Sequence, residues 1–363
     1  MVACLACAIL VPAQSLKSPT SNTRSFNNTV AQLRSNLKNG SVPAEEFPGP
    51  AARVFDQLVH EASGGSSAEE ISWELRVVKG LTGNAFSLPD GAVYVDDEMV
   101  QLLGNDPGLW AAILAHEIVH VTQHHWTKRA IFQESLRDSH ESWRFVQLGA
   151  FPAELTSSTP ADQEHELADF SQDLELEADV GSLSLMARSG FHPDFVTALY
   201  HLMETQEGDS GAAHFLASHP RWDVRESHLR KRYSAALAEF EKLWPDPANS
   251  PGGNPPVLAF VGRPKAEFGS HHTSAEVSLP IRCENSSGGV EVVLLLRGFR
   301  APDLPPSEQT RKIRQTIDCT SNRTSASFVL SATGPRNEAD VEFYVLDSRG
   351  WVLARSSKLR VRY

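Results

Sequence analysis

The chain has 363 residues, which is enough for two domains, and 41% of them are hydrophobic, as in globular proteins. Its formal net charge of -12 argues against binding to nucleic acid or to an anionic membrane surface. After the first residues no stretch approaches the roughly 18 apolar residues that span a bilayer, so we expect no transmembrane segment beyond a signal peptide.

The start of the chain has features of an export signal. Residues 2–13 form a short apolar run that ends in Val11-Pro12-Ala13, a small-residue pattern typical of a cleavage site. We therefore predict a signal peptide over residues 1–13, although no positive charge precedes the run. Residues 14–45 are rich in Ser, Thr and Asn and predict a flexible leader. The expected location of the protein is the periplasm or the extracellular space.

A strand pair and a helix are predicted next along the chain. Residues 84–95 predict two strands, because Pro89-Asp90-Gly91 supplies a turn between them. A mostly buried helix is predicted from Asp106 to about Trp126, with Asp106 as N-cap and Pro107 at the first helical position. Apolar residues then recur at helical spacing, at Leu109, Ala112, Ile113, Ile118 and Val121.

This helix contains the sequence His116-Glu117-Ile118-Val119-His120. Histidines four residues apart lie on one face of a helix, so both imidazoles can bind one zinc ion. Glu117 is offset around the same turn and can face a water on the metal, as in zinc peptidases. If both histidines were instead core residues bonded to backbone, Glu117 would be an unexplained polar residue on an apolar helix.

A second apolar helix is predicted from Asp173 to the C-terminal signal at Gly190. Glu175 and Asp179 share one face of it, so one carboxylate can bind zinc while the other hydrogen-bonds a ligand histidine. A solvated acidic face is the alternative. It is favoured by the acids that surround the pair, at Asp162, Glu164, Glu166, Asp169 and Asp173. Spacing alone leaves both interpretations open.

The remaining chain predicts a separate β domain. Residues 245–256 are rich in Pro, Gly and Asn and predict a linker after a first domain over residues 46–244. Residues 257–363 predict an all-β sandwich of immunoglobulin-like type. Its strand-like runs are residues 257–261, 275–281, 290–296, 325–330, 341–346 and 351–354. It can serve to bind a substrate, a partner or the cell envelope, or only to shield the first domain.

The four cysteines fall into two pairs. Cys4 and Cys7 lie near the start of the chain, whereas Cys283 and Cys319 both lie in the predicted sandwich. After export the second pair can form one disulfide. Two free thiols are the alternative.

Four blocks of sequence, in order, resemble the M48 family of zinc metallopeptidases. They are residues 84–91, residues 116–122, Glu175-Leu176-Glu177-Ala178-Asp179, and residues 215–220 followed by Arg225. The resemblance covers about residues 50–232. It implies an α+β fold in which a mostly helical zincin-type domain with a small sheet precedes the β domain. It also implies one zinc per chain, with Glu175 as the third ligand and Asp179 as the aspartate beside the site.

The same resemblance gives roles to three further groups. His219 is expected near the zinc, either stabilising the oxyanion or binding the metal reversibly as a fourth ligand. Arg225 either orders the site or pairs with acids on a neighbouring helix. Asn84, Ala85 and Phe86 lie on a strand that holds substrate in extended form by backbone pairing, or that is only structural.

Two functions follow. The first is a zinc endopeptidase that cleaves exported or envelope proteins in unfolded or flexible segments, with Glu117 as general base. The second is a chaperone-like binding protein that retains the metallopeptidase scaffold but cleaves little. The presence of Glu117 beside all three ligands favours the first, because an inactive scaffold does not need a general base.

Overall fold

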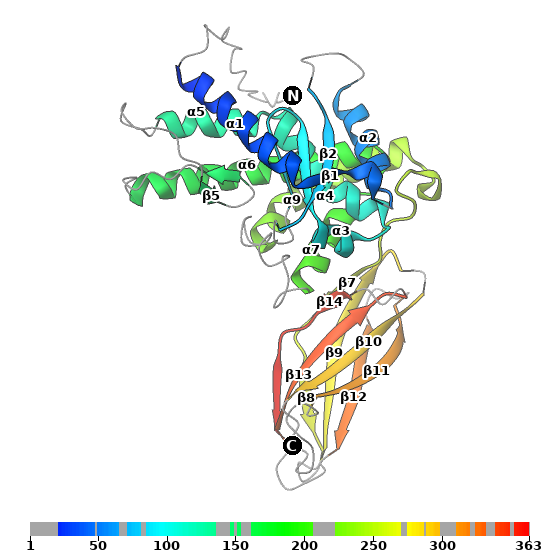
Figure 1. Ribbon diagram of the computed structural model, residues 1–363. Helices are drawn as coiled ribbons and strands as arrows, with labels where there is room; N and C mark the ends of the chain where they lie inside the picture. The colour runs from blue at the N-terminus through cyan, green and yellow to red at the C-terminus, as the bar shows by residue number, and fades with distance from the viewer. Residues whose placement is uncertain are drawn as a thin grey trace, which may run out of the picture.

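The computed structural model folds into a helical part with a small sheet, followed by a β domain (Figure 1). The residues that it describes are 21–47, 49–64, 71–80, 85–135, 146–148, 151–153, 161–205, 222–269, 274–286, 288–297, 310–319, 324–331, 338–348 and 352–362. The predicted signal peptide over residues 1–13, Asn84 and His219 therefore lie outside the described residues.

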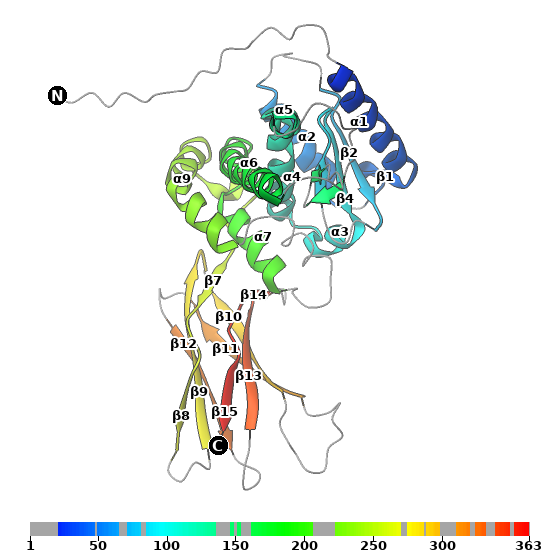
Figure 2. The ribbon, with the colours of Figure 1, turned by 90° about the vertical axis from the view of Figure 1, so that its left-hand side faces the viewer.

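The helical part is built around helix α4, whose side chains are almost all buried. Helix α6 packs on one side of it, with α9 against α6, and a four-stranded sheet of order β1-β2-β4-β3 lies on the other side of α4 (Figure 2). The helices are α1 (Ser21–Asn39), α2 (Ala51–Ala62), α3 (Asp97–Leu103), α4 (Pro107–Thr122), α5 (His125–Ser135), α6 (Ala161–Arg188), α7 (Asp194–Thr205) and α9 (Trp222–Leu243), with a 3-10 turn at Ala44–Glu46. The strands are β1 (Ser41–Pro43), β2 (Glu74–Val78), β3 (Ala85–Ser87), β4 (Ala92–Asp96), β5 (Val146–Leu148) and β6 (Phe151–Ala153).

Residues 21–45 are not the flexible leader that composition predicted. They form α1, β1 and the start of a 3-10 turn. Leu33 and Leu37 of α1 pack against a small apolar cluster over the sheet, and Arg34 donates hydrogen bonds to Glu74 and Asp90. A polar helix can be stable when one apolar stripe and a few ion pairs fix it to a sheet, and composition does not reveal such contacts.

Helix α4 ends earlier than predicted, and helix α6 begins earlier than predicted. Asp106 caps α4 by accepting hydrogen bonds from the amides of Gly108 and Leu109, as expected. The helix ends at Thr122 rather than near Trp126, because His124 adopts a left-handed conformation with φ of 55° and a new helix begins. Helix α6 begins at Ala161, twelve residues before the predicted start at Asp173, so the acidic stretch is itself helical.

The strand pair predicted within residues 84–95 is confirmed by the antiparallel pairing of β3 with β4. The amide of Leu88 donates to the carbonyl of Ala92 across the turn, at 2.7 Å. Gly91 has φ of 97°, and a Cβ there would meet Ile71 at 2.4 Å. The turn therefore requires glycine on both conformational and steric grounds.

The β domain consists of two sheets that enclose one apolar core. One sheet has the order β11-β10-β13-β14, with β15 also paired to β13, and the other has β12-β9-β7, with β8 also paired to β9. All six predicted runs are strands. The strands are β7 (Leu258–Val261), β8 (Lys265–Phe268), β9 (Ser274–Glu284), β10 (Gly289–Arg297), β11 (Thr310–Asp318), β12 (Thr324–Ser331), β13 (Glu338–Leu346), β14 (Val352–Arg355) and β15 (Leu359–Arg362). Sequence reasoning missed β8, β11 and β15, which are rich in charged residues.

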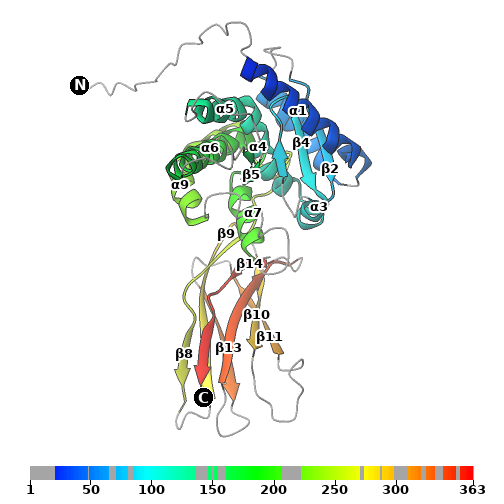
Figure 3. The same ribbon diagram turned by 60° about the vertical axis from the view of Figure 1, so that its left-hand side comes forward.

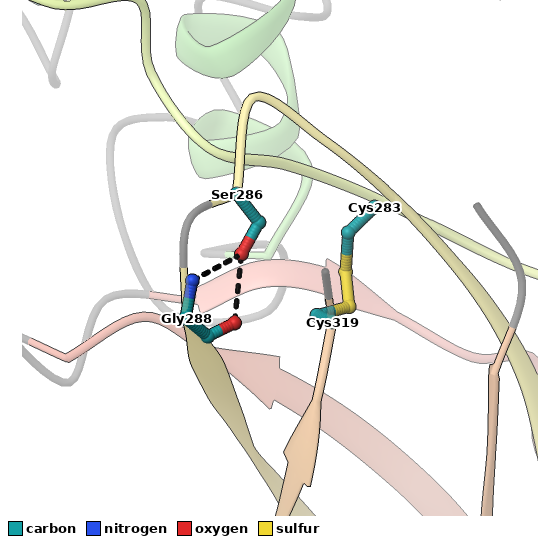
Figure 4. Close-up of a disulfide and its surroundings, with 4 residues drawn as sticks. All are labelled: Cys283, Ser286, Gly288 and Cys319. Atoms are coloured by element: carbon teal, nitrogen blue, oxygen red, sulfur yellow. Dashed lines mark hydrogen bonds between the residues drawn. A yellow bond between two sulfur atoms is a disulfide. The ribbon is translucent and has the colours of Figure 1, made fainter. Parts of the chain in front are cut away.

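Cys283 and Cys319 form a disulfide, so the first of the two cysteine alternatives is the one found (Figure 4). Next to it, the Ser286 hydroxyl donates to the Gly288 carbonyl and accepts from the Gly288 amide, which holds the turn between β9 and β10. The Cys319 amide donates to the same carbonyl at 3.4 Å. The disulfide thus joins the end of β9 to the residue that follows β11.

The β domain contacts the helical part through α7 (Figure 3). The side-chain amide of Asn285 donates to Asp194 at 2.5 Å, and the His201 ring packs edge-on against Phe260 with centroids 5.6 Å apart. Residues 245–256, predicted as a linker, include a 3-10 turn at Pro247–Asn249. Because the Gly252 amide also donates to the Gly190 carbonyl at 3.0 Å, this segment is packed against the end of α6.

Candidate metal centre

Helices α4 and α6 bring His116, His120 and Glu175 together in the core of the helical part. All three are at most 4% exposed. The Nε2 atoms of the two histidines are 3.0 Å apart, and Glu175 places one oxygen 3.2 Å from His116 Nε2 and the other 3.6 Å from His120 Nε2. Ligands bound to a tetrahedral zinc at about 2.0–2.2 Å are separated by roughly 3.3–3.6 Å. The spacing of these donor atoms therefore fits a single metal ion.

The second carboxylate of the pair, Asp179, faces the other side of the His116 ring. Its Oδ1 lies 3.1 Å from His116 Nδ1. A proton is therefore favoured on Nδ1, and Nε2 presents its lone pair to the cluster. Burial alone would lower the pKa of His116, but the hydrogen bonds and charges of Asp179 and Glu175 outweigh it and raise the pKa to about 9. An environment that favours a proton so strongly also favours a metal cation.

Asp179 is itself held by Arg225 on α9 and Tyr200 on α7. Arg225 Nε donates to Asp179 Oδ2 at 2.7 Å, and its Nη2 donates to Oδ1. The Tyr200 hydroxyl donates to Oδ1 at 3.3 Å, and the guanidinium lies over the Tyr200 ring at 4.3 Å. Burial raises the pKa of Asp179, but the charges and hydrogen bonds of Arg225 and His116 together outweigh it, so the net pKa is lowered and the carboxylate is ionised. Sequence analysis named Arg225 but not Tyr200.

His120 is oriented by His125, the first residue of α5. His125 is fully buried, and its Nδ1 lies 2.8 Å from His120 Nδ1. Burial, and then the charge of Lys128, lower the pKa of His125 to about 4. Its other ring nitrogen lies 3.3 Å from Glu177, which also accepts from Lys128 at 2.9 Å. Glu177 therefore lies outside the three-residue cluster.

Three of the remaining predicted site residues, Glu117, Ala85 and Phe86, are among those that the structure describes. Glu117 is 1% exposed and lies one residue after His116 on α4. Ala85 and Phe86 are on β3, which packs against α4, but their side chains are buried and Phe86 stacks on Tyr94 at 5.3 Å. Contact of these two residues with a substrate would therefore be made by backbone atoms.

Two histidines and a glutamate on two buried helices, with an acid next to the first histidine, define a candidate metallohydrolase. The sequence model of peptidase family M48 matches residues 51–233, half of the chain, and the chain belongs to this family. It is 32% identical over 193 residues to the mitochondrial metalloendopeptidase OMA1 of Schizosaccharomyces pombe. That match covers 50% of this chain and 54% of the relative. It is 31% identical over 159 residues to the β-barrel assembly-enhancing protease of Yersinia pestis. That match covers 41% of this chain and 32% of the relative.

The chain spans about half or less of the length of these curated relatives. Among solved structures it resembles Ste24p of S. mikatae at 16% identity, over 57% of this chain and 55% of that one, with a TM-score of 0.29. A score this low carries no argument about the fold. Within the described residues, no helix has the length and apolar character needed to cross a membrane.

Proposed function

We propose that this chain is a zinc-dependent endopeptidase that cleaves exported or envelope proteins in their unfolded or flexible segments. One observation carries the proposal. The donor atoms of His116, His120 and Glu175 converge at the separations of a single metal site, and Glu117 lies beside them on α4. A site with two neutral imidazoles and one carboxylate is a common ligand set of catalytic zinc.

Within this proposal His116, His120 and Glu175 hold the zinc. When bound, zinc lowers the pKa of a water ligand and polarises the scissile carbonyl. Glu117 would act as the general base for the attacking water and then as the acid that protonates the leaving amine. His219 stands near the metal in the same scheme, either as an oxyanion donor or as a reversible fourth ligand. Asp179 and Arg225 keep the His116 ring in the orientation that directs Nε2 inward.

The substrate is proposed to lie along β3 as an added strand. The buried side chains of Ala85 and Phe86 support recognition through the backbone, and Asn84, which precedes them in the sequence, is part of the same proposal. Backbone pairing requires an extended segment but imposes little sequence preference. Unfolded or flexible segments meet that requirement, whereas a folded domain does not.

Export is proposed from the apolar run over residues 1–13 and is supported by the Cys283–Cys319 disulfide, since disulfides persist mainly in oxidising compartments.

We also propose that the β domain is an immunoglobulin-like sandwich, because its two antiparallel sheets share one core. A partner in the cell envelope is one role for it.

The proposal is tested by cleavage of casein, an unfolded substrate, with the purified chain. We expect cleavage to stop in the presence of a chelator and to return when zinc is added. A chaperone-like binding protein would instead bind casein and zinc without cutting the substrate. That outcome would replace the endopeptidase by the alternative function.

A further inference from the structure

A hollow of about 490 Å³ lies on the outer face of the larger sheet of the β domain. Strand β10 lies between β11 and β13 in this sheet (Figure 1). Alternate β10 residues from Val290 to Leu296 belong to the core, so Val293, Leu295 and Arg297 face outward. The hollow is lined by Val293, Leu295, Arg297, Lys312, Arg314, Tyr344 and Leu346.

The floor of the hollow is apolar, which is unusual for the outer face of a two-layer β domain. Outward positions of antiparallel strands are normally polar. Here Val293 and Leu295 point outward but are each only 6% exposed. The register places Arg314 opposite Val293 and Lys312 opposite Leu295, so long cationic side chains border a recessed apolar surface.

The border of the hollow has an excess of positive charge in a chain whose net charge is -12. Neighbouring acids on this face are already paired with arginines, namely Glu291 with Arg314 at 2.7 Å, Glu342 with Arg355 at 2.5 Å and Asp340 with Arg360 at 2.9 Å. Arg297 and Lys312 are exposed, and no ion pair joins either of them to another described residue. An anionic group on a ligand would find two available cations here.

We propose that this hollow binds an extended peptide segment that combines apolar and acidic side chains. An apolar side chain would occupy the recess over Val293 and Leu295, while a carboxylate two residues away, on the same face of the extended peptide, would pair with Arg297 or Lys312. The recess argues against a membrane as the occupant, because a flat bilayer surface cannot reach a floor that is 6% exposed behind charged side chains. As a docking site for substrates, the hollow depends on the proposed endopeptidase function.

The test uses the full chain with Glu117→Gln, so that a bound peptide is not cut. Fluorescence anisotropy measures binding of a labelled peptide that repeats Leu-Ser-Glu-Ser, which places Leu and Glu on one face of an extended chain, and of a matched peptide with Lys in place of Glu. We expect only the acidic peptide to bind, and Arg297→Glu and Lys312→Glu each to weaken binding about tenfold or more. The control Lys265→Glu changes an exposed lysine on β8 of the other sheet and should have no effect.

Equal binding of the two peptides, or unchanged binding in both border variants, would overturn the proposal. The proposal would also fail if the chain bound phosphatidylglycerol vesicles, and if the border variants abolished this vesicle binding but left peptide binding unchanged. If the wild-type chain fails to cleave casein but these peptide results hold, the endopeptidase function fails and the peptide site stands.

Discussion

Replacing Asp179 by Asn should lower the free energy of unfolding of the helical part by roughly 3–5 kcal/mol, the usual cost of removing one partner of a buried ion pair. Asp179 is 1% exposed and Arg225 is 0% exposed, so water cannot solvate the guanidinium that loses its counter-charge. Asparagine has nearly the same volume as aspartate. The loss is therefore electrostatic and does not come from a cavity.

The assay is urea unfolding followed by circular dichroism of the helices, which lie in the helical part, with a chelator present to exclude any contribution from metal. The double variant Asp179→Asn/Arg225→Met removes both charges and should recover most of the loss. If the single variant costs less than about 1 kcal/mol, or if the double variant is no more stable than the single one, the ion pair does not have the role given to it here.

Three further predictions concern the metal ligands, their support and the disulfide. Glu175→Ala should greatly reduce zinc retention in metal analysis, whereas Glu177→Ala should not, because that carboxylate projects about 200° away around α6; the reverse result would mean that the wrong glutamate is assigned. Tyr200→Phe removes only the hydroxyl that donates to the aspartate beside the site, so zinc affinity in a chelator competition should fall by less than the roughly 10–100-fold typical of groups that contact a ligand histidine directly. Unchanged affinity would show that this hydroxyl does not support the site. Changing both Cys283 and Cys319 to Ser should lower the stability of the β domain by roughly 2–4 kcal/mol in urea, given a separation of 36 residues, and no change in the urea midpoint would contradict this.

The most local features of the site could be predicted from sequence. The N-cap at Asp106 and the helix that carries His116 and His120 depend on residues close together in the chain, and the structure forms both. The third ligand on the partner helix could be assigned only through the resemblance, since Glu175 and Glu177 are equally acidic by composition. Packing of α6 against α4 is what distinguishes them, and packing is not encoded in spacing.

Long-range contacts explain what sequence reasoning missed. The left-handed conformation of His124 ends α4 before the predicted helix end and brings His125 against His120, a contact that no sequence spacing indicates. Tyr200 reaches Asp179 from a helix whose sequence gives no sign of a polar role. Strand β11 lies at the edge of its sheet, where charged side chains are common. Its many charged residues therefore concealed the strand pattern in the sequence.

The most direct test of the central claim is casein cleavage by the Glu117→Gln variant, purified free of host proteases and analysed for metal. The account predicts that the variant folds and holds one zinc per chain, because Glu117 is not a ligand, while kcat falls by several orders of magnitude. Cleavage close to that of the wild-type chain would contradict it, because no other residue has been given the role of general base.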